Sequence, residues 1–77
     1  MLFLIQYDRA RGQIVRLQSF SDRDLKNVEN VRLELELELN RLGEDHEIVI
    51  LEAASEKALR LTHRRYFEDL DDLVRAS

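Results

Sequence analysis

Cysteine is absent from this 77-residue sequence, and so is proline. Without cysteine the chain can form no disulfide, no thiolate zinc site and no thiol nucleophile. Without proline, an internal repeat or a low-complexity segment, nothing marks a linker, so we expect one small domain over residues 1–77. A chain this short buries only about 60 to 65% of its unfolded surface, so its core is thin and self-association is a natural source of additional burial.

Long apolar runs are also missing. The apolar opening from Met1 to Ile5 gives way at once to polar residues and has no basic segment before it, which is too short for a signal peptide or a membrane span. We therefore expect a cytoplasmic protein without membrane contact. The formal net charge of −4 is uneven, because residues 1–32 carry six Lys or Arg and four Asp or Glu, whereas residues 33–77 carry six and twelve. An acidic total argues against general affinity for nucleic acid.

Three segments have the pattern of strands. Leu2 to Tyr7 is apolar on both faces, which is typical of a central strand. Gln13 to Phe20 is more polar and follows a short link that ends in Gly12, so we expect it to form a hairpin with the first segment and to lie at an edge of the sheet. Glu47 to Ala53 contains an unbroken apolar run, which predicts a third strand covered on both faces.

Val31 to Leu42 is the most ambiguous stretch, because four leucines alternate with three glutamates between Leu33 and Leu39. Alternation favours a strand, whereas leucine and glutamate are strong helix formers. A helix is favoured by a stripe at spacings of three and four, which consists of Leu25, Val28, Val31, Leu35, Leu39 and Leu42. We predict one helix from about Asp22 to Leu42 that stops at Gly43. The alternative is a break near Asn30 followed by a strand, which would give the element order ββαββα.

Ser55 is placed to cap a second helix. The expected buried stripe of that helix is formed by Ala58, Leu59, Thr62, Tyr66, Leu70 and Leu73. The fold prediction is thus an α+β domain of order ββαβα, with a three-stranded sheet in the order 2-1-3. A right-handed crossover between the second and third strands leads us to expect two helices on one face of the sheet.

That arrangement leaves the second face of the sheet uncovered and apolar, which commonly marks an association site. We therefore predict a homodimer formed by stacked sheets, paired edge strands or crossed long helices. On the predicted first helix Leu33 and Leu37 lie together on the side away from the core stripe, so they are the candidate residues for self-association. The alternative is a monomer whose second face is covered by the acidic C-terminal segment.

A basic cluster on the second helix is the best candidate for binding an anion. Lys57, Arg60 and Arg64 fall on neighbouring turns, as a phosphate-binding surface would require. The competing interpretation is structural, because Glu56 and Glu68 stand four residues from Arg60 and Arg64 and would pair with them along the helix.

Two acidic groups complete the candidates. Residues 44–47 (Glu-Asp-His-Glu) include possible metal ligands, but adjacent residues without a second ligand group indicate a solvated loop rather than a metal site. Asp69, Asp71 and Asp72 alternate with leucines in an acidic, amphipathic end that either engages a basic partner or is a solvated face.

No paired catalytic groups, nucleotide-binding loop or cofactor motif occurs at a telling spacing. We therefore expect a non-enzymatic protein-interaction or regulatory module that acts as a homodimer and needs no cofactor. One alternative is a nucleic-acid-binding regulator that uses the basic face of the second helix. Another is an acidic inhibitor or immunity-type protein that masks a basic partner.

Overall fold

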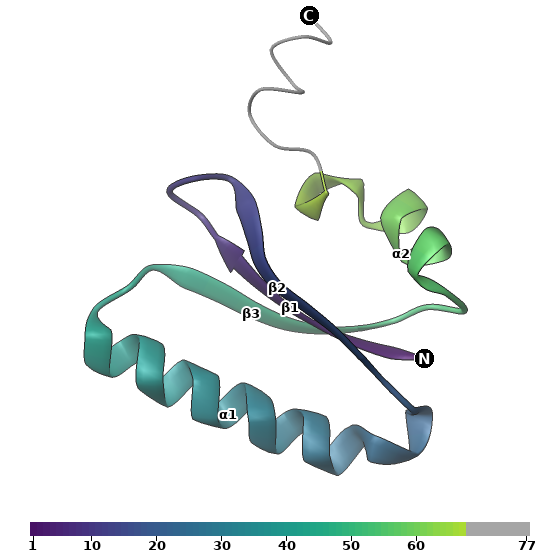
Figure 1. Cartoon of the computed structure of the whole chain (residues 1–77), viewed down its shortest axis with the longest axis horizontal. Coiled ribbons are helices and arrows are strands. Elements are labelled where there is room, and N and C mark those ends of the chain that lie inside the picture. The colour runs from purple at the N-terminus through teal and green to yellow at the C-terminus, as the bar shows by residue number, and fades with distance from the viewer. Residues whose placement is uncertain (68–77) are drawn as a thin grey trace, which may run out of the picture.

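A computed structural model describes residues 1–67 of the chain. Its sheet contains β1 (Leu2–Asp8), β2 (Gln13–Phe20) and β3 (His46–Glu52). β1 lies in the middle and pairs antiparallel with both neighbours, which gives the order β2-β1-β3 (Figure 1). The predicted α+β class, the ββαβα order and the strand order are all confirmed.

The hairpin between β1 and β2 is closed by local polar contacts. The Asp8 carboxylate accepts hydrogen bonds from the backbone N–H groups of Ala10 and Arg11, at 3.0 and 3.1 Å. Gly12 has φ 65° and donates its N–H to the Asp8 carbonyl at 2.8 Å. Glycine adopts this left-handed conformation without the steric cost that a side chain adds, so the turn forms where the sequence predicted it.

β2 contains a bulge. Arg16 pairs with Gln6 and Ile14 pairs with Tyr7, so Val15 between them has no partner on β1. The extra residue places Ile14 on the same side of the sheet as Tyr7, where it adds to the apolar cluster on that face.

The ambiguous stretch is helical. After β2 a 3-10 turn, η1 (Asp22–Asp24), leads into α1 (Leu25–Leu42). The Ser21 hydroxyl accepts from the N–H of Arg23 at 3.3 Å, and Gly43 ends the helix with φ 71°. The alternating leucines and glutamates therefore belong to one helix, and the strand alternative is wrong.

The predicted stripe faces the sheet along most of its length. Val28 and Leu39 are buried, and Val31 and Leu35 are half-buried, whereas the end residues of the stripe are exposed. This side of α1 packs against one face of the sheet, in a cluster with Leu2, Leu4, Phe20, Ile48 and Ile50.

The second helix is shorter than predicted. α2 (Glu56–Thr62) is followed by a 3-10 turn, η2 (Arg64–Tyr66). The Ser55 hydroxyl accepts from the N–H of Ala58 at 3.1 Å, as a capping serine should. The Thr62 hydroxyl donates to the carbonyls of Ala58 and Leu59, so Thr62 satisfies its side chain at the helix end and is exposed, not buried as predicted.

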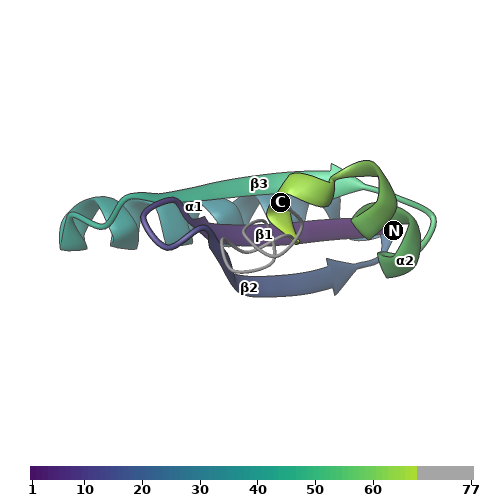
Figure 2. The ribbon, with the colours of Figure 1, turned by 90° about the horizontal axis from the view of Figure 1, so that it is seen from above.

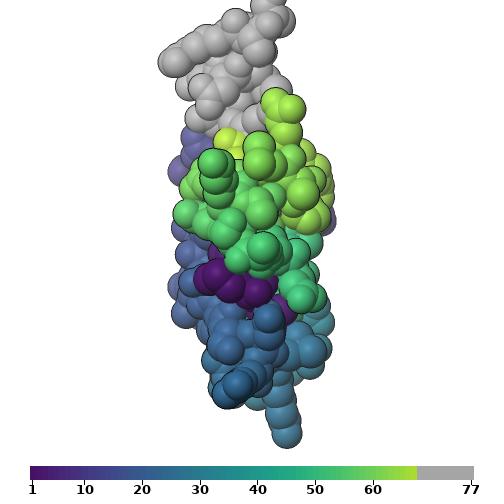
Figure 3. Space-filling model, turned by 90° about the vertical axis from the view of Figure 1, so that its right-hand side faces the viewer, coloured from purple at the N-terminus to yellow at the C-terminus, as the bar shows by residue number. Residues whose placement is uncertain are grey.

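The predicted placement of two helices on one face of the sheet is wrong. α1 covers the face of Leu2 and Leu4, whereas α2 and η2 cover the opposite face, where Leu59 and Tyr66 are buried against Phe3 and Ile5 (Figures 1 and 3). The physical reason lies in β1, whose apolar side chains point to both faces and need cover on both. The described residues thus form three layers, a helix, a sheet and a helix, in which the long α1 lies on one face and the shorter α2 and η2 lie on the other.

Candidate functional site

The outer edge of β3 is one of the two edges of the sheet. Among residues 1–67, β3 pairs with β1 on one side and with no strand on the other (Figure 2). The N–H of Ala53, just beyond the strand, donates to the Met1 carbonyl at 3.1 Å. Backbone groups alternate in direction along a strand, so those of Leu51 and Val49 also face β1, whereas those of Ile48 and Ile50 face outward.

The central side chains of β3 carry no charge that would protect this edge. Ile48, Val49, Ile50 and Leu51 form an apolar run without a charge, and all four are half-buried. β3 pairs with β1 in continuous register, without a bulge. Natural sheets discourage edge pairing by charges, prolines, bulges and short strands, so this edge lacks the usual protection.

The β2 edge is different. Its bulge at Val15 interrupts the ladder, and Arg16 and Gln18 place polar groups along it. These are the features that block pairing with another chain. Of the two sheet edges, only the β3 edge is suited to accept a further strand.

The predicted self-association residues lie on the outer side of α1. Leu33 is 55% exposed and Leu37 is 61% exposed, so both point away from the sheet as the helical spacing predicted. On one flank of the helix, the Arg32 guanidinium lies 3.7 Å from the Glu36 carboxylate. On the other flank, Glu38 and residues of β2 line a cavity of about 280 Å³. The helix therefore has an apolar ridge between two charged flanks.

The three basic candidates do not all lie on the one helix that the sequence predicted. Lys57 and Arg60 lie on α2 and Arg64 lies on η2, because the helix ends between them, and all three are exposed. The Arg60 guanidinium lies 3.6 Å from Glu56 and 4.6 Å from the ring centroid of Phe67. Arg60 is thus engaged in local contacts, as the structural interpretation expected.

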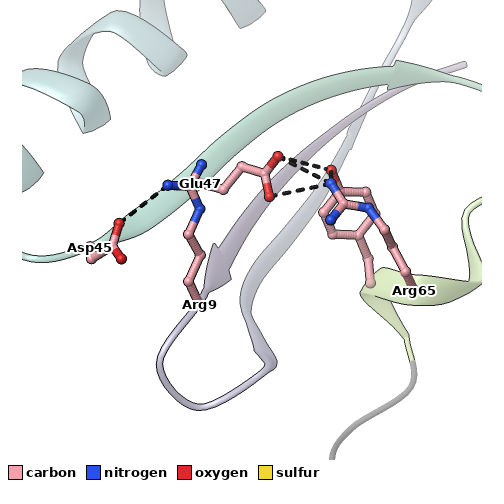
Figure 4. Close-up of polar contacts among 5 residues, drawn as sticks. Arg9, Asp45, Glu47 and Arg65 are labelled. Carbon is pink, nitrogen blue, oxygen red and sulfur yellow. Dashed lines mark hydrogen bonds and ion pairs between the residues drawn. The ribbon is translucent and has the colours of Figure 1, made fainter.

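Glu47 is a residue whose role the sequence analysis missed. Its carboxylate accepts from Arg65 at 3.2 Å and from the Tyr66 hydroxyl at 3.2 Å, so β3 is joined to η2 (Figure 4). The Tyr66 ring also meets Tyr7 edge-on, with centroids 5.3 Å apart. Burial raises the pKa of Tyr66, the Glu47 carboxylate raises it further, and Arg65 opposes this in part.

His46 belongs to β3 rather than to a solvated loop. Its Nδ1 lies 2.8 Å from the Gln6 amide nitrogen, and its Nε2 lies 3.6 Å from Asp8 and 3.8 Å from Glu44. Asp45, beside it, accepts from Arg9 at 3.3 Å and joins the loop before β3 to the hairpin (Figure 4). Within residues 1–67 no group of three or more His, Cys, Asp or Glu side chains is arranged to hold a metal ion.

A second cavity, of about 390 Å³, opens between the hairpin and the end of the described chain. Arg60, Tyr66 and Phe67 line it together with Ile14 and Leu17. Arg60, which lines this cavity, already contacts Glu56 and Phe67.

The acidic candidates Asp69, Asp71 and Asp72 lie outside the described residues. Over the part that is described, no helix combines the length and apolarity needed to cross a membrane. No family model, curated protein or solved structure matches this chain.

Proposed function

We propose that this protein is a non-enzymatic interaction or regulatory module that acts as a homodimer. The observation that carries the proposal is the edge of β3, where, among residues 1–67, an apolar run lies beside backbone N–H and C=O groups that pair with no other strand. Such an edge binds another strand through main-chain hydrogen bonds. A second copy of the chain always supplies a matching edge, and the isologous contact is the commonest form of dimer.

The three-layer fold narrows the ways in which two copies can meet. Stacking of sheets is disfavoured as a route, because α1 packs on one face and α2 and η2 pack on the other. Edge pairing and crossing of the α1 helices through Leu33 and Leu37 remain. The edge is favoured because it adds hydrogen bonds along a whole strand, whereas the helix offers two leucine side chains.

Light scattering tests the homodimer directly. We expect a mass of about twice the 9.2 kDa of the chain at micromolar concentration. The double substitution Leu33→Glu and Leu37→Glu should leave that mass unchanged if the edge forms the dimer, because neither side chain faces the sheet. A loss of the dimer in this variant would assign the contact to the helix ridge. A monomeric mass for the natural chain would overturn the proposed function.

A further inference from the structure

We propose that two copies pair through β3 in one defined register, antiparallel about a two-fold axis at Val49, to form a continuous six-stranded sheet. This inference rests on the proposed homodimer and specifies its interface. It follows from the direction of the backbone groups, from the residues that the pairing brings together and from the position of α1 beside the edge.

The direction of the backbone groups restricts the register. The groups of Ile48 and Ile50 face outward, by alternation from the Ala53 to Met1 hydrogen bond. In an antiparallel pair, residues that exchange hydrogen bonds must both direct these groups toward the partner strand. Two-fold axes at Ile48, Val49 or Ile50 satisfy this condition, whereas axes that fall between two residues do not.

The side chains select Val49 from these three positions. An axis at Val49 places Ile48 opposite the partner's Ile50 and His46 opposite the partner's Glu52, so apolar residues meet in the centre and polar residues meet at the ends. An axis at Ile48 places His46 opposite the partner's Ile50. An axis at Ile50 places Glu52 opposite the partner's Ile48. Of the three registers, only the axis at Val49 places apolar residues opposite apolar residues and polar residues opposite polar residues at every outward position of β3.

The flank of α1 completes the interface. Glu38 lines a cavity with Val15 and Arg16 of β2, so helical spacing places Arg32 and Glu36 on the opposite flank, toward β3. Val31 and Leu35 pack in one cluster with Ile48 and Ile50, which sets this part of the helix at the level of Val49.

The two-fold axis then brings two α1 helices side by side on one face of the joined sheet. α1 lies over β3 and β1 (Figure 2), so the helices would be separated by about two strand spacings, roughly 10 Å, which is an ordinary helix packing distance. The antiparallel helices would set Arg32 of each copy beside Glu36 of the other. The intramolecular pair, 3.7 Å apart along one helix, can thus be exchanged for a pair between copies.

Cross-linking tests this register, because the natural chain has no cysteine. In the proposed dimer the two Val49 residues form a non-hydrogen-bonded pair with Cα atoms about 4.5 Å apart, within the range of a disulfide. Val49→Cys should therefore give a covalent dimer in high yield under mild oxidation at low protein concentration. The matched control is Leu37→Cys, whose more exposed side chain should stay mainly uncross-linked.

Hydrogen exchange on the natural chain gives a test that needs no substitution. The outward amides of Ile48 and Ile50 on β3 should exchange at least about tenfold more slowly than the outward amides of Leu17 and Ser19 on β2. The protection should fall as the protein is diluted.

The possible outcomes separate the two proposals. A monomeric mass overturns both of them. A dimeric mass with efficient cross-linking through Leu37→Cys but not Val49→Cys, or with equally fast exchange on both edges, overturns the β3 register and leaves the homodimer intact.

Discussion

The two helices cover opposite faces of one sheet but are attached to it in different ways. α1 runs for 18 residues, packs a long apolar stripe and has a stop signal at Gly43. α2 has seven residues and is attached chiefly through Leu59, while the turn that follows contributes Tyr66. The long helix is specified by local signals repeated along its length, whereas the short one depends on a few contacts with residues far away in the sequence.

The largest expected effect comes from the anchor of α2. Leu59 is completely buried, so Leu59→Ala should lower the free energy of unfolding by about 2–5 kcal/mol through lost burial and the cavity left behind. Urea unfolding followed by circular dichroism measures the change. Leu61→Ala is the control on the same helix, because Leu61 is 67% exposed and its truncation should cost less than about 0.5 kcal/mol. Equal losses in the two variants would contradict this account of α2.

An intermediate effect is expected at the end of α1. Gly43 has φ 71°, and a Cβ placed there would meet no atom within 4 Å, so the cost of Gly43→Ala is backbone strain alone. We expect thermal unfolding to show a loss of about 1–2 kcal/mol. Gly43→Asn should lose less, since asparagine tolerates the left-handed region better than alanine. An alanine variant as stable as the natural chain would show that α1 does not need this stop.

The smallest expected effect on stability concerns the hydrogen bond that joins η2 to β3. Tyr66→Phe removes the hydroxyl that contacts Glu47 and should cost about 1 kcal/mol near neutral pH. Because folding raises the pKa of Tyr66, its contribution to stability is fully present below the ordinary value of 10.0 and is lost as the pH rises through the higher value in the folded chain.

The pH dependence of unfolding above pH 10 distinguishes this mechanism from simple packing. Tyr66→Phe should reduce the alkaline loss of stability, whereas Tyr7→Phe, which leaves the Glu47 contact in place, should retain it. An alkaline profile unchanged by Tyr66→Phe would exclude Tyr66 as its source.

Much of the fold was predictable from local patterns. Residue spacing identified the stripe of α1, a single glycine marked its end, and the same spacing placed Leu33 and Leu37 on its outer side. The central place of β1 was predicted from its apolar side chains on both faces, which are typical of a strand with neighbours on both sides.

The face chosen by α2 was not predictable in the same way. A short link at residues 53–55 joins β3 to α2, and such a link can turn toward either face of the sheet. The choice is made by contacts between distant residues, as when Tyr66 meets both Tyr7 and Glu47. No periodicity within the helix encodes these contacts. The early end of α2 was missed because Thr62 fits an apolar stripe by position while its hydroxyl bonds to the backbone.

The central place of β1 also has a consequence for the order of folding. β1 pairs with β2 through a local hairpin. Its pairing with β3 closes a loop of residues 9–45, and such non-local contacts form slowly. During synthesis β1 emerges before α1, and its second partner β3 emerges only after α1. Until β3 is available, a hairpin of β1 and β2 leaves one side of β1 unpaired, and a helix in the intervening chain would shorten the search that brings β3 to it.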